Sequence, residues 1–413
     1  MPSKGGSRAS RGVGATTSPS PVAAIVAEAT GARPVAVAPS AAVQDDPPVD
    51  TPDWARHYGQ AVARYEEDRA RRDREAAESQ ALWDEFLMVQ GESVPEGERS
   101  LATNDALHAR LMELARRQSG EYQREDVIGD PNQTFGVEIE FDGADPNAVA
   151  RALHDAGLCA SPTQEGYHSG RRQPGMWTVE RDATVTGEIV SPVLTDSPQS
   201  WDQLERVCNI LRQHGARVSA RTGGHVHVGC DSANLDHDVN RFRRIATVCS
   251  WAEDLMYRLA AGTGRSGRQH RGAGNGYRWC GPMRTGQFEQ SASLSDLSYQ
   301  VGASHSVGLN YANILDTRRT IEYRYFDSSL DPVRLQNNIR LACWLTKRAA
   351  ELPDSAIPAD RAPLGTHAAA PSGEEGEQLL RRFADLVYVR PQDKLRLYAQ
   401  YQRSAWQRLR RSA

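Results

Sequence analysis

The chain of 413 residues lacks several features that would each indicate a familiar class of protein. No apolar run approaches the roughly 20 residues that a membrane-spanning helix needs. The six cysteines are scattered without a CxxC pair, which disfavours a zinc ribbon and is typical of reduced thiols. A formal net charge of -4 gives no general attraction to nucleic acid or to an anionic membrane. We therefore expect neither nucleic acid nor membrane as a partner.

A targeting segment and a phosphate-binding loop are missing as well. The apolar run at 22–27 is too short for a signal peptide, which favours the cytoplasm. No GxxxxGK[ST] occurs, and the GxGxxG formed by Gly262, Gly264 and Gly267 follows a predicted helix, so we discount it. Lysine is scarce whereas alanine and arginine abound, a composition typical of a GC-rich bacterial genome or its phage.

Composition divides the chain into four parts. The first fifty residues are mostly Ala, Pro, Ser, Gly and Val, and cannot bury enough apolar surface to offset their conformational entropy. Charged, helix-forming sequence follows, with helices expected at 52–90 and 104–117 that could mediate self-association. The predicted parts are a disordered tail (1–50), a helical extension (51–128), a main domain (129–352), and a linker with C-terminal helices at 374–389 and 392–410 (353–413).

Hydrophobic periodicity and turn residues predict an α+β main domain. The expected strands are 134–141, 177–181, 187–190, the segment around His225, 307–314 and 320–326. The expected helices are 146–157, 201–214, 239–260 and 332–352. Residues 262–283 are rich in Gly and Arg, which predicts a long loop, either a lid that brings cations to an anionic ligand or a disordered surface loop.

Three of the predicted strands place ionisable side chains two residues apart, between apolar residues. The pairs are Glu138 with Glu140, His225 with His227, and Glu322 with Arg324. Because residues i and i+2 of a strand point to one face, each pair projects together while its apolar neighbours point into a core. Glu188 adds a carboxylate on a further strand. A face of this kind suits divalent metal and phosphate, and it predicts an enzyme.

The acidic face needs compensating charge, because crowded carboxylates raise one another's pKa unless a cation is present. Lysine, a usual partner on a solvated face, is missing from all these strands. Mg²⁺ commonly binds carboxylates together with substrate phosphates, so facing glutamates could hold two or three such ions around a nucleotide. Arg324 could form a simple ion pair with Glu322 or stabilise a phosphoryl group in transfer. The HxH pair could bind zinc or be structural.

Taken in order, the motifs resemble the amidoligase family. They are FGVEIEF at 135–141, WTVERD at 177–182, GEIVSP at 187–192, GGHVHVG at 223–229 and TIEYRYF at 320–326. This family belongs to the carboxylate–amine ligase superfamily, which includes glutamine synthetase and glutamate–cysteine ligase. The resemblance covers about residues 130–350 and implies a curved antiparallel β-sheet backed by helices, with ATP and Mg²⁺ on the concave face.

The resemblance also implies roles for individual residues. The metal-binding acids, for Mg²⁺ or alternatively Mn²⁺, are matched by Glu138, Glu140, Glu188 and Glu322. Arg324 matches the phosphate-contacting arginine, and His227, with His225 beside it, lies at the position near nucleotide or metal. Asp182 matches an aspartate that could act as a base or bind the ammonium.

The sequence departs from the family pattern at two places. The family aspartate usually stands in Asp-Gly-Ser, whereas the Asp-Ala-Thr found here keeps a hydroxyl at Thr184 but loses the glycine. A basic residue often precedes the Leu-Asn strand, where His305 and Ser306 stand in this chain. These departures bear on whether the site is catalytically competent.

The sequence thus predicts an ATP- and Mg-dependent ligase that forms an amide or peptide bond through an acyl phosphate. Its partners would be ATP and a carboxylate- and an amine-bearing small molecule or peptide. Two alternatives stay open. A zinc-dependent hydrolase would use His225 and His227, with Glu188 or Asp182 as a third ligand, and would need no ATP. A non-catalytic binding module on the same fold would retain the site only as a surface.

Overall fold

The computed structural model of the chain describes residues 53–91, 122–167, 173–219, 221–260, 280–281, 283, 288–301, 307–358 and 373–404. The predicted tail at 1–50, the predicted helix at 104–117 and most of the Gly- and Arg-rich segment at 262–283 lie outside these residues, as do His305 and Ser306.

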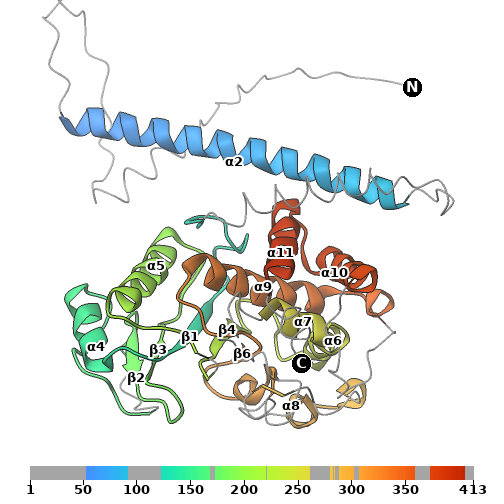
Figure 1. Cartoon of the computed structure of the whole chain (residues 1–413). Helices are drawn as coiled ribbons and strands as arrows, with labels where there is room; N and C mark the ends of the chain where they lie inside the picture. The colour runs from blue at the N-terminus through green and yellow to red at the C-terminus, as the bar shows by residue number, and fades with distance from the viewer. Residues whose placement is uncertain are drawn as a thin grey trace, which may run out of the picture. The chain divides into compact units, whose positions relative to one another are not determined.

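The chain divides into two compact units, Met1–Glu67 and Asp68–Ala413, with the division inside a long helix. That helix is α2, Asp53–Gly91, and its bounds confirm the helix predicted at 52–90. It is the blue helix of Figure 1. Within the described part of the chain, no helix is both long and apolar enough to cross a membrane.

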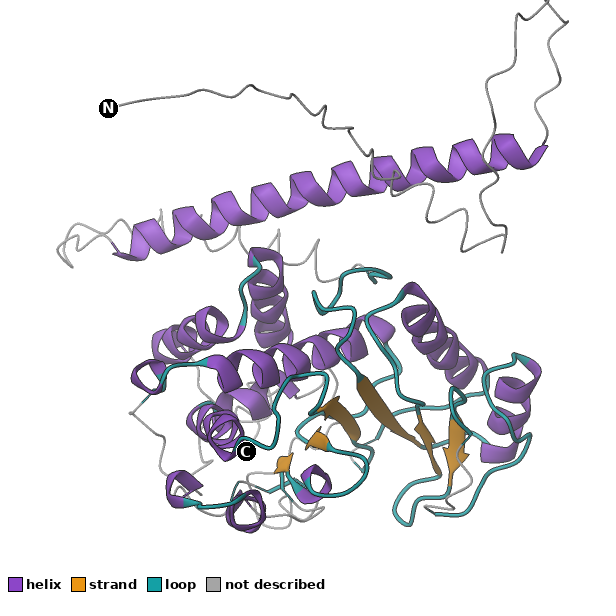
Figure 2. Ribbon diagram, turned by 180° about the vertical axis from the view of Figure 1, so that it is seen from behind, coloured by secondary structure: helices purple, strands orange, loops and turns teal. Residues whose placement is uncertain are grey.

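A six-stranded, entirely antiparallel sheet forms the centre of the second unit, in the order β2-β3-β1-β4-β6-β5. The strands are β1 (Phe135–Phe141), β2 (Thr178–Glu180), β3 (Gly187–Val190), β4 (Gly224–Gly229), β5 (Leu309–Asn310) and β6 (Thr320–Tyr323). Figure 2 shows them in orange among the surrounding helices. The prediction of an α+β domain built on an antiparallel sheet is confirmed.

Helices supply the other layer of this unit. They are α4 (Pro146–Asp155), α5 (Pro198–Gln213), α6 (Val239–Trp251), α7 (Glu253–Ala260), α8 (Leu294–Val301), α9 (Pro332–Glu351), α10 (Gly373–Val387) and α11 (Pro391–Arg403). Helix α5 begins three residues before the predicted start, because Ser197 caps its N-terminus and Pro198 occupies its first turn. Helix α8 was not predicted.

The alternation of β1 divides its side chains between core and site. Phe135, Val137, Ile139 and Phe141 are buried in the apolar core. Phe135 stacks on Trp201 of α5, with 5.1 Å between the ring centroids. Helices α4 and α9 contact the sheet at β2 and β4. The intervening residues Glu138 and Glu140 therefore project from the opposite face.

Three predicted elements were wrong in extent. The helix predicted at 239–260 is interrupted at Ala252, whose backbone (φ -101°, ψ 15°) ends α6 before α7 begins. The strand predicted at 307–314 is limited to Leu309–Asn310, preceded by a single bridge from Val307 to Gly281. There the Asn310 side chain accepts a hydrogen bond from the Ala312 amide at 2.9 Å, and the chain turns into a 3₁₀ helix at Ala312–Ile314. Strand β6 ends at Tyr323 instead of Phe326.

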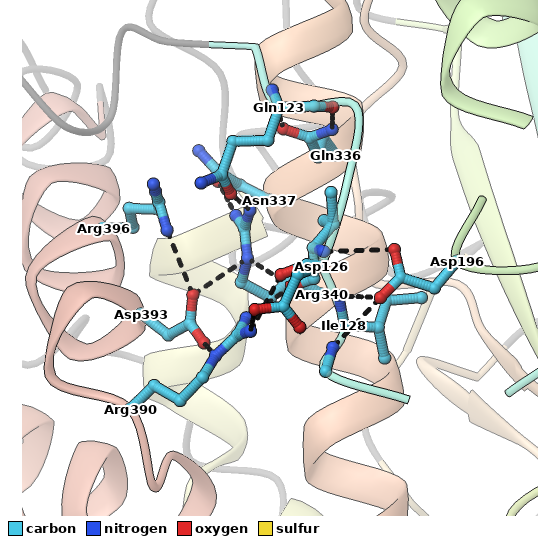
Figure 3. Close-up of polar contacts among 12 residues, drawn as sticks. Gln123, Asp126, Ile128, Asp196, Gln336, Asn337, Arg340, Arg390, Asp393 and Arg396 are labelled. Carbon is cyan, nitrogen blue, oxygen red and sulfur yellow. Dashed lines mark hydrogen bonds and ion pairs between the residues drawn. The ribbon is translucent and has the colours of Figure 1, made fainter. Parts of the chain in front are cut away.

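A buried ion cluster fastens the C-terminal helices to α9 (Figure 3). Asp393 of α11 is fully buried and contacts Arg340 of α9 at 3.1 Å, Arg390 at 2.6 Å and Arg396 at 3.2 Å. Arg340 also donates to the Val127 carbonyl at 3.1 Å. The segment before β1 and the C-terminal helix thus share one anchoring point on α9.

Candidate active site

The ionisable side chains form three neighbouring rows across the sheet, because residues opposite one another in antiparallel register share a face. The first row is Glu180, Glu188 and Glu140, on β2, β3 and β1. The second places Glu138 of β1 opposite His225 of β4, with Arg324 beside His225. The third is His227, Glu322 and Asn310, on β4, β6 and β5.

All the predicted site residues line one cavity of about 770 Å³. They are Glu138, Glu140, Asp182, Glu188, His225, His227, Glu322 and Arg324. Tyr167, Arg181 and Asn313 line it as well. The structure therefore brings together residues that span almost two hundred positions of the sequence.

Both histidines contact the same carboxylate. His225 Nδ1 lies 2.7 Å from Glu138 Oε2, and His227 Nε2 lies 3.1 Å from Glu138 Oε1. Burial opposes ionisation of Glu138, but the two imidazoles, His227 first, hold the pKa of Glu138 well below its usual value. Burial also opposes protonation of His227, yet the charge of Glu138 raises the pKa of His227. Glu138 is thus held as a carboxylate between two rings.

His225 belongs to two groups of ligand atoms that could each hold a metal ion. One group is Glu138, His225 and Glu322, and the other is Glu140, Glu188 and His225. His225 Nδ1 faces the first group, 3.7 Å from Glu322 Oε1, whereas Nε2 lies 3.8 Å from Glu140 Oε1. Buried Nε2 has no hydrogen-bond partner within the described part of the chain. Its ring therefore presents one nitrogen to each group.

Glu188 lies between carboxylates of the two neighbouring strands. It is 5% exposed, and it faces Glu140 on one side and Glu180 on the other. Burial, followed by the negative charges of Glu138 and Glu140, raises the pKa of Glu188 well above its usual value. An added cation would remove this penalty.

Arg324 is the buried cation of the site, at 7% exposure. Its Nη1 donates to Glu322, and Glu322 also accepts from the Asn310 amide at 2.7 Å. Burial opposes the charge of Arg324, but Glu322 raises its pKa. The Nε atom of Arg324 is buried and has no partner among the described residues. An anion in the cavity could satisfy this donor.

Asp182 supports its own loop. One carboxylate oxygen accepts from the Thr184 amide at 2.6 Å, the Thr184 hydroxyl at 2.7 Å and the Val185 amide at 3.1 Å. Ala183 is not among the described residues with positive φ, so this turn does not require glycine. The Asp-Ala-Thr departure thus leaves the backbone conformation of the turn accessible.

Three residues of the site escaped the prediction. Glu180 stands two positions before Asp182 on a three-residue strand, and its alternation with Val179 was a usable signal. Asn310 holds Glu322, and the Gly223 amide donates to Glu140 at 2.6 Å. The Asn310–Glu322 and Gly223–Glu140 contacts depend on the register between strands, which could not be predicted from the sequence.

A smaller cavity of about 310 Å³ adjoins the first. Its lining includes apolar Val190, Pro192 and Val193. Glu138, His227 and Arg318 line both cavities, so the two meet at these residues. Arg318 is held there by Asp316, with Nε 2.7 Å from Oδ2.

The fold and the cavity together define a class: an α+β protein whose open antiparallel sheet carries clustered carboxylates, two histidines and a buried arginine. A model of the family described as "Putative amidoligase enzyme" matches residues 131–346, which is more than half of the chain. The chain belongs to this amidoligase family.

Two solved structures match this chain at low sequence identity. One, described as a novel glutamine synthase homologue, is 14% identical with a TM-score of 0.36, and the match covers 73% of this chain and 71% of that one. The other is a bifunctional glutathione synthetase from Pasteurella multocida, 13% identical with a TM-score of 0.39, covering 73% of this chain and 52% of that one. The chain thus spans about half the length of the second structure. No curated protein matches.

Proposed function

We propose that this chain is an ATP- and Mg²⁺-dependent carboxylate–amine ligase that forms an amide or peptide bond through an acyl phosphate. Membership of the amidoligase family supports a carboxylate–amine ligase. The observation that carries the proposal is the single cavity in which two groups of candidate metal ligands share His225, next to a buried arginine.

The side chains fit divalent cations. Glu140, Glu188 and His225, whose Nε2 has no partner among the described residues, would hold one ion. The carboxylates of Glu138 and Glu322 would hold another, because His225 Nδ1 is the N–H donor to Glu138 and has no lone pair for a metal. Carboxylate oxygens suit Mg²⁺ or Mn²⁺. Bound there, such ions would neutralise the negative charge of the phosphates.

The chemistry begins with a poor acyl donor, because a free carboxylate would have to expel oxide. Attack of the carboxylate on the γ-phosphorus of ATP gives an acyl phosphate and ADP. Arg324 would stabilise the charge of the phosphoryl group during transfer, since its unpartnered Nε can donate to an oxygen. His225 and His227 would stand beside the phosphates, with His227 held by Glu138.

The second half-reaction joins the amine to the activated carbonyl. An amine that binds as an ammonium must lose one proton before its nitrogen can attack; attack then expels inorganic phosphate and releases a second proton to solvent. We assign to Asp182 the binding of the ammonium and acceptance of the first proton, since it lines the cavity near Glu188. Its turn hydrogen bonds occupy one oxygen, which leaves the second to face a ligand.

The smaller cavity suits the nucleoside end of ATP. Its apolar walls would pack on a base, and its junction with the larger cavity at His227 and Arg318 would lead the phosphates towards the carboxylates. The amine and carboxylate substrates would then approach from the part of the larger cavity lined by Tyr167, Arg181 and Asp182.

The zinc hydrolase is less well supported. Neither of the candidate ligand groups formed by the described residues contains both histidines. His227 instead contacts Glu138. A non-catalytic module on this fold would form neither ADP nor hydroxamate with any carboxylate.

The reaction can be tested by trapping the acyl phosphate. The full chain would be incubated with Mg-ATP, hydroxylamine and a panel of amino acids, dicarboxylic acids and peptides. We expect one carboxylate to give ADP and hydroxamate in equal amounts, and Arg324→Gln to reduce both by roughly 100-fold or more. Arg319→Gln is the matched control, because Arg319 pairs with Asp231 at 2.8 Å and lines neither cavity. No ADP with any carboxylate, together with stoichiometric zinc in the purified protein, would favour the hydrolase.

A further inference from the structure

A buried carboxylate outside the cavity joins three segments that carry cavity residues. Asp142, at 5% exposure, directly follows β1. It accepts hydrogen bonds from the Thr186 amide and hydroxyl, each at 3.1 Å, and from the Ser219 hydroxyl at 2.6 Å. Arg221 contacts both of its oxygens at 3.2 Å. The backbone of Asp142 also pairs with that of Arg217: the Asp142 amide donates to the Arg217 carbonyl at 2.9 Å, and the Asp142 carbonyl accepts from the Arg217 amide at 2.8 Å.

Each of these segments supports one ligand of the same candidate metal group. Asp142 itself stands two residues after Glu140, and Thr186 stands two residues before Glu188. The segment at 219–223 leads into β4, which carries His225. Asp142 is therefore connected to Glu140, Glu188 and His225 through short stretches of backbone.

The connection to Glu140 can be followed atom by atom. The Ser219 amide donates a hydrogen bond to the Thr222 hydroxyl at 2.9 Å, and this hydroxyl donates to the Ser219 carbonyl at 3.0 Å. The next residue, Gly223, donates its amide to Glu140 Oε2 at 2.6 Å. This bond turns the carboxylate so that Oε1 faces His225 Nε2, 3.8 Å away. The orientation of Glu140 thus depends on the loop that Asp142 holds.

We propose that Asp142 is a positioning residue that sets the separation of Glu140, Glu188 and His225 for binding a divalent cation. This inference rests on the proposed function, since it requires that the second ligand group binds such an ion. Asp142 itself does not line the cavity and would not touch the ion.

The carboxylate form matters because every one of these contacts to its side chain comes from a donor. An asparagine keeps the size of Asp142 but offers one acceptor oxygen and turns an N–H donor towards the Arg221 guanidinium, which can only donate. Asp142→Asn should therefore loosen the 186 and 219–223 segments together. Ser219→Ala removes the hydrogen bond to Asp142 and the one that the same hydroxyl accepts from the Arg221 amide at 3.1 Å, keeps the Thr186 contacts, and serves as the milder variant.

The chain offers a matched control in Asp196, shown in Figure 3. Asp196 is also buried, at 8% exposure, and accepts from the Val127, Ile128 and Gly129 amides and the Trp201 ring nitrogen, all away from the cavity. Asp196→Asn should lower the thermal midpoint as Asp142→Asn does. It should leave the affinity for metal unchanged.

The test is titration of the full-length chain with Mn²⁺ alone. Binding affinity and stoichiometry are measured by calorimetry and, independently, by the decrease of the electron paramagnetic resonance signal of free Mn²⁺. We expect Asp142→Asn to weaken one class of sites by about tenfold or more. Ser219→Ala should weaken the same class to a smaller extent. Asp196→Asn should bind Mn²⁺ as the wild type does.

Four outcomes of the Mn²⁺ titration support or overturn the positioning role of Asp142. Weakening in Asp142→Asn and Ser219→Ala but not in Asp196→Asn supports the positioning role, and Ser219→Ala alone carries the test if Asp142→Asn does not fold. Unchanged affinity in both of these variants overturns it while leaving the proposed function intact. Equal weakening in Asp196→Asn also overturns it, since the effect would then be general destabilisation. A wild type that binds no Mn²⁺ contradicts both proposals.

Discussion

Among single residues, Glu188 shows most clearly what the cavity requires. It is buried between other acids, and that burial together with the charges of Glu138 and Glu140 raises its pKa. A carboxyl group with a raised pKa in the folded state favours folding below the pKa of the unfolded chain. This contribution to stability is lost as the pH rises from the pKa of the group in the unfolded chain through its pKa in the folded protein. Without a cation, Glu188 therefore contributes less to the stability of the fold near neutral pH than at acidic pH.

Glu188→Gln should consequently stabilise the metal-free protein at pH 7.5 more than at pH 4.5. We expect a gain of the order of 1 kcal/mol, the usual size of a single-site effect on stability, because glutamine carries no charge whose burial opposes folding at the higher pH. Thermal denaturation in EDTA at the two pH values measures the difference. Adding Mg²⁺ should then stabilise the wild type and have little effect on the variant. An equal gain at both pH values would contradict this account of Glu188.

Much of the site was predictable at this scale, because period-two alternation alone puts Glu138 with Glu140 and His225 with His227 on one face. The assignment of functions to these residues came from the resemblance and stays a prediction. What alternation could not reveal was which strands are neighbours. The contact of His225 with Glu138, and that of Asn310 with Glu322, both follow from register between strands that are far apart in sequence.

At the scale of elements, strand β5 and the residues after β6 are held by one close backbone contact. The Gly308 carbonyl accepts from the Arg324 amide at 2.7 Å. A Cβ atom at Gly308 would lie 2.2 Å from the Tyr325 ring, which is fully buried and packs edge-on against Tyr257. Glycine at position 308 thus permits the approach that places Arg324.

Gly308→Ala should destabilise the protein by about 1–3 kcal/mol, because neither the buried ring nor the backbone can yield without strain. Urea denaturation followed by fluorescence measures this effect. Gly166→Ala is the control, since a Cβ there meets nothing within 4 Å. Equal stability of the two variants would show that the 307–309 segment adapts freely.

The elements that were mispredicted share a physical cause. Interruption of the 239–260 helix at Ala252 has no Gly or Pro to signal it. The buried Glu253 that follows accepts from the Met283 amide and the Tyr325 hydroxyl, each at 3.1 Å. Strand β5 ends where the Asn310 side chain bonds the Ala312 amide. Side-chain contacts with distant or neighbouring backbone decided these boundaries, and periodicity carries no record of them.

At the scale of the whole molecule, the C-terminal helices are part of the packing around α9. Trp251 of α6 lies against Phe383 of α10, with ring centroids 6.4 Å apart. Asp393 accepts contacts from three arginines, and burial lowers the pKa of Arg340 to about 9. The boundary of the main domain predicted at residue 352 stays a proposal. These contacts favour extending the main domain through α11.

The central claim is that the acidic sheet face binds Mg-ATP. It is tested most directly by calorimetric titration of Mg-ATP into the full-length wild type and Glu138→Gln, with the exposed-surface variant Glu351→Gln as control. Glu138 belongs to one metal group and lies at the junction of both cavities. We predict one nucleotide per chain, binding that requires the divalent ion, and affinity reduced at least about tenfold by Glu138→Gln but not by Glu351→Gln. Absence of binding in the wild type, or equal binding by Glu138→Gln, would contradict the account.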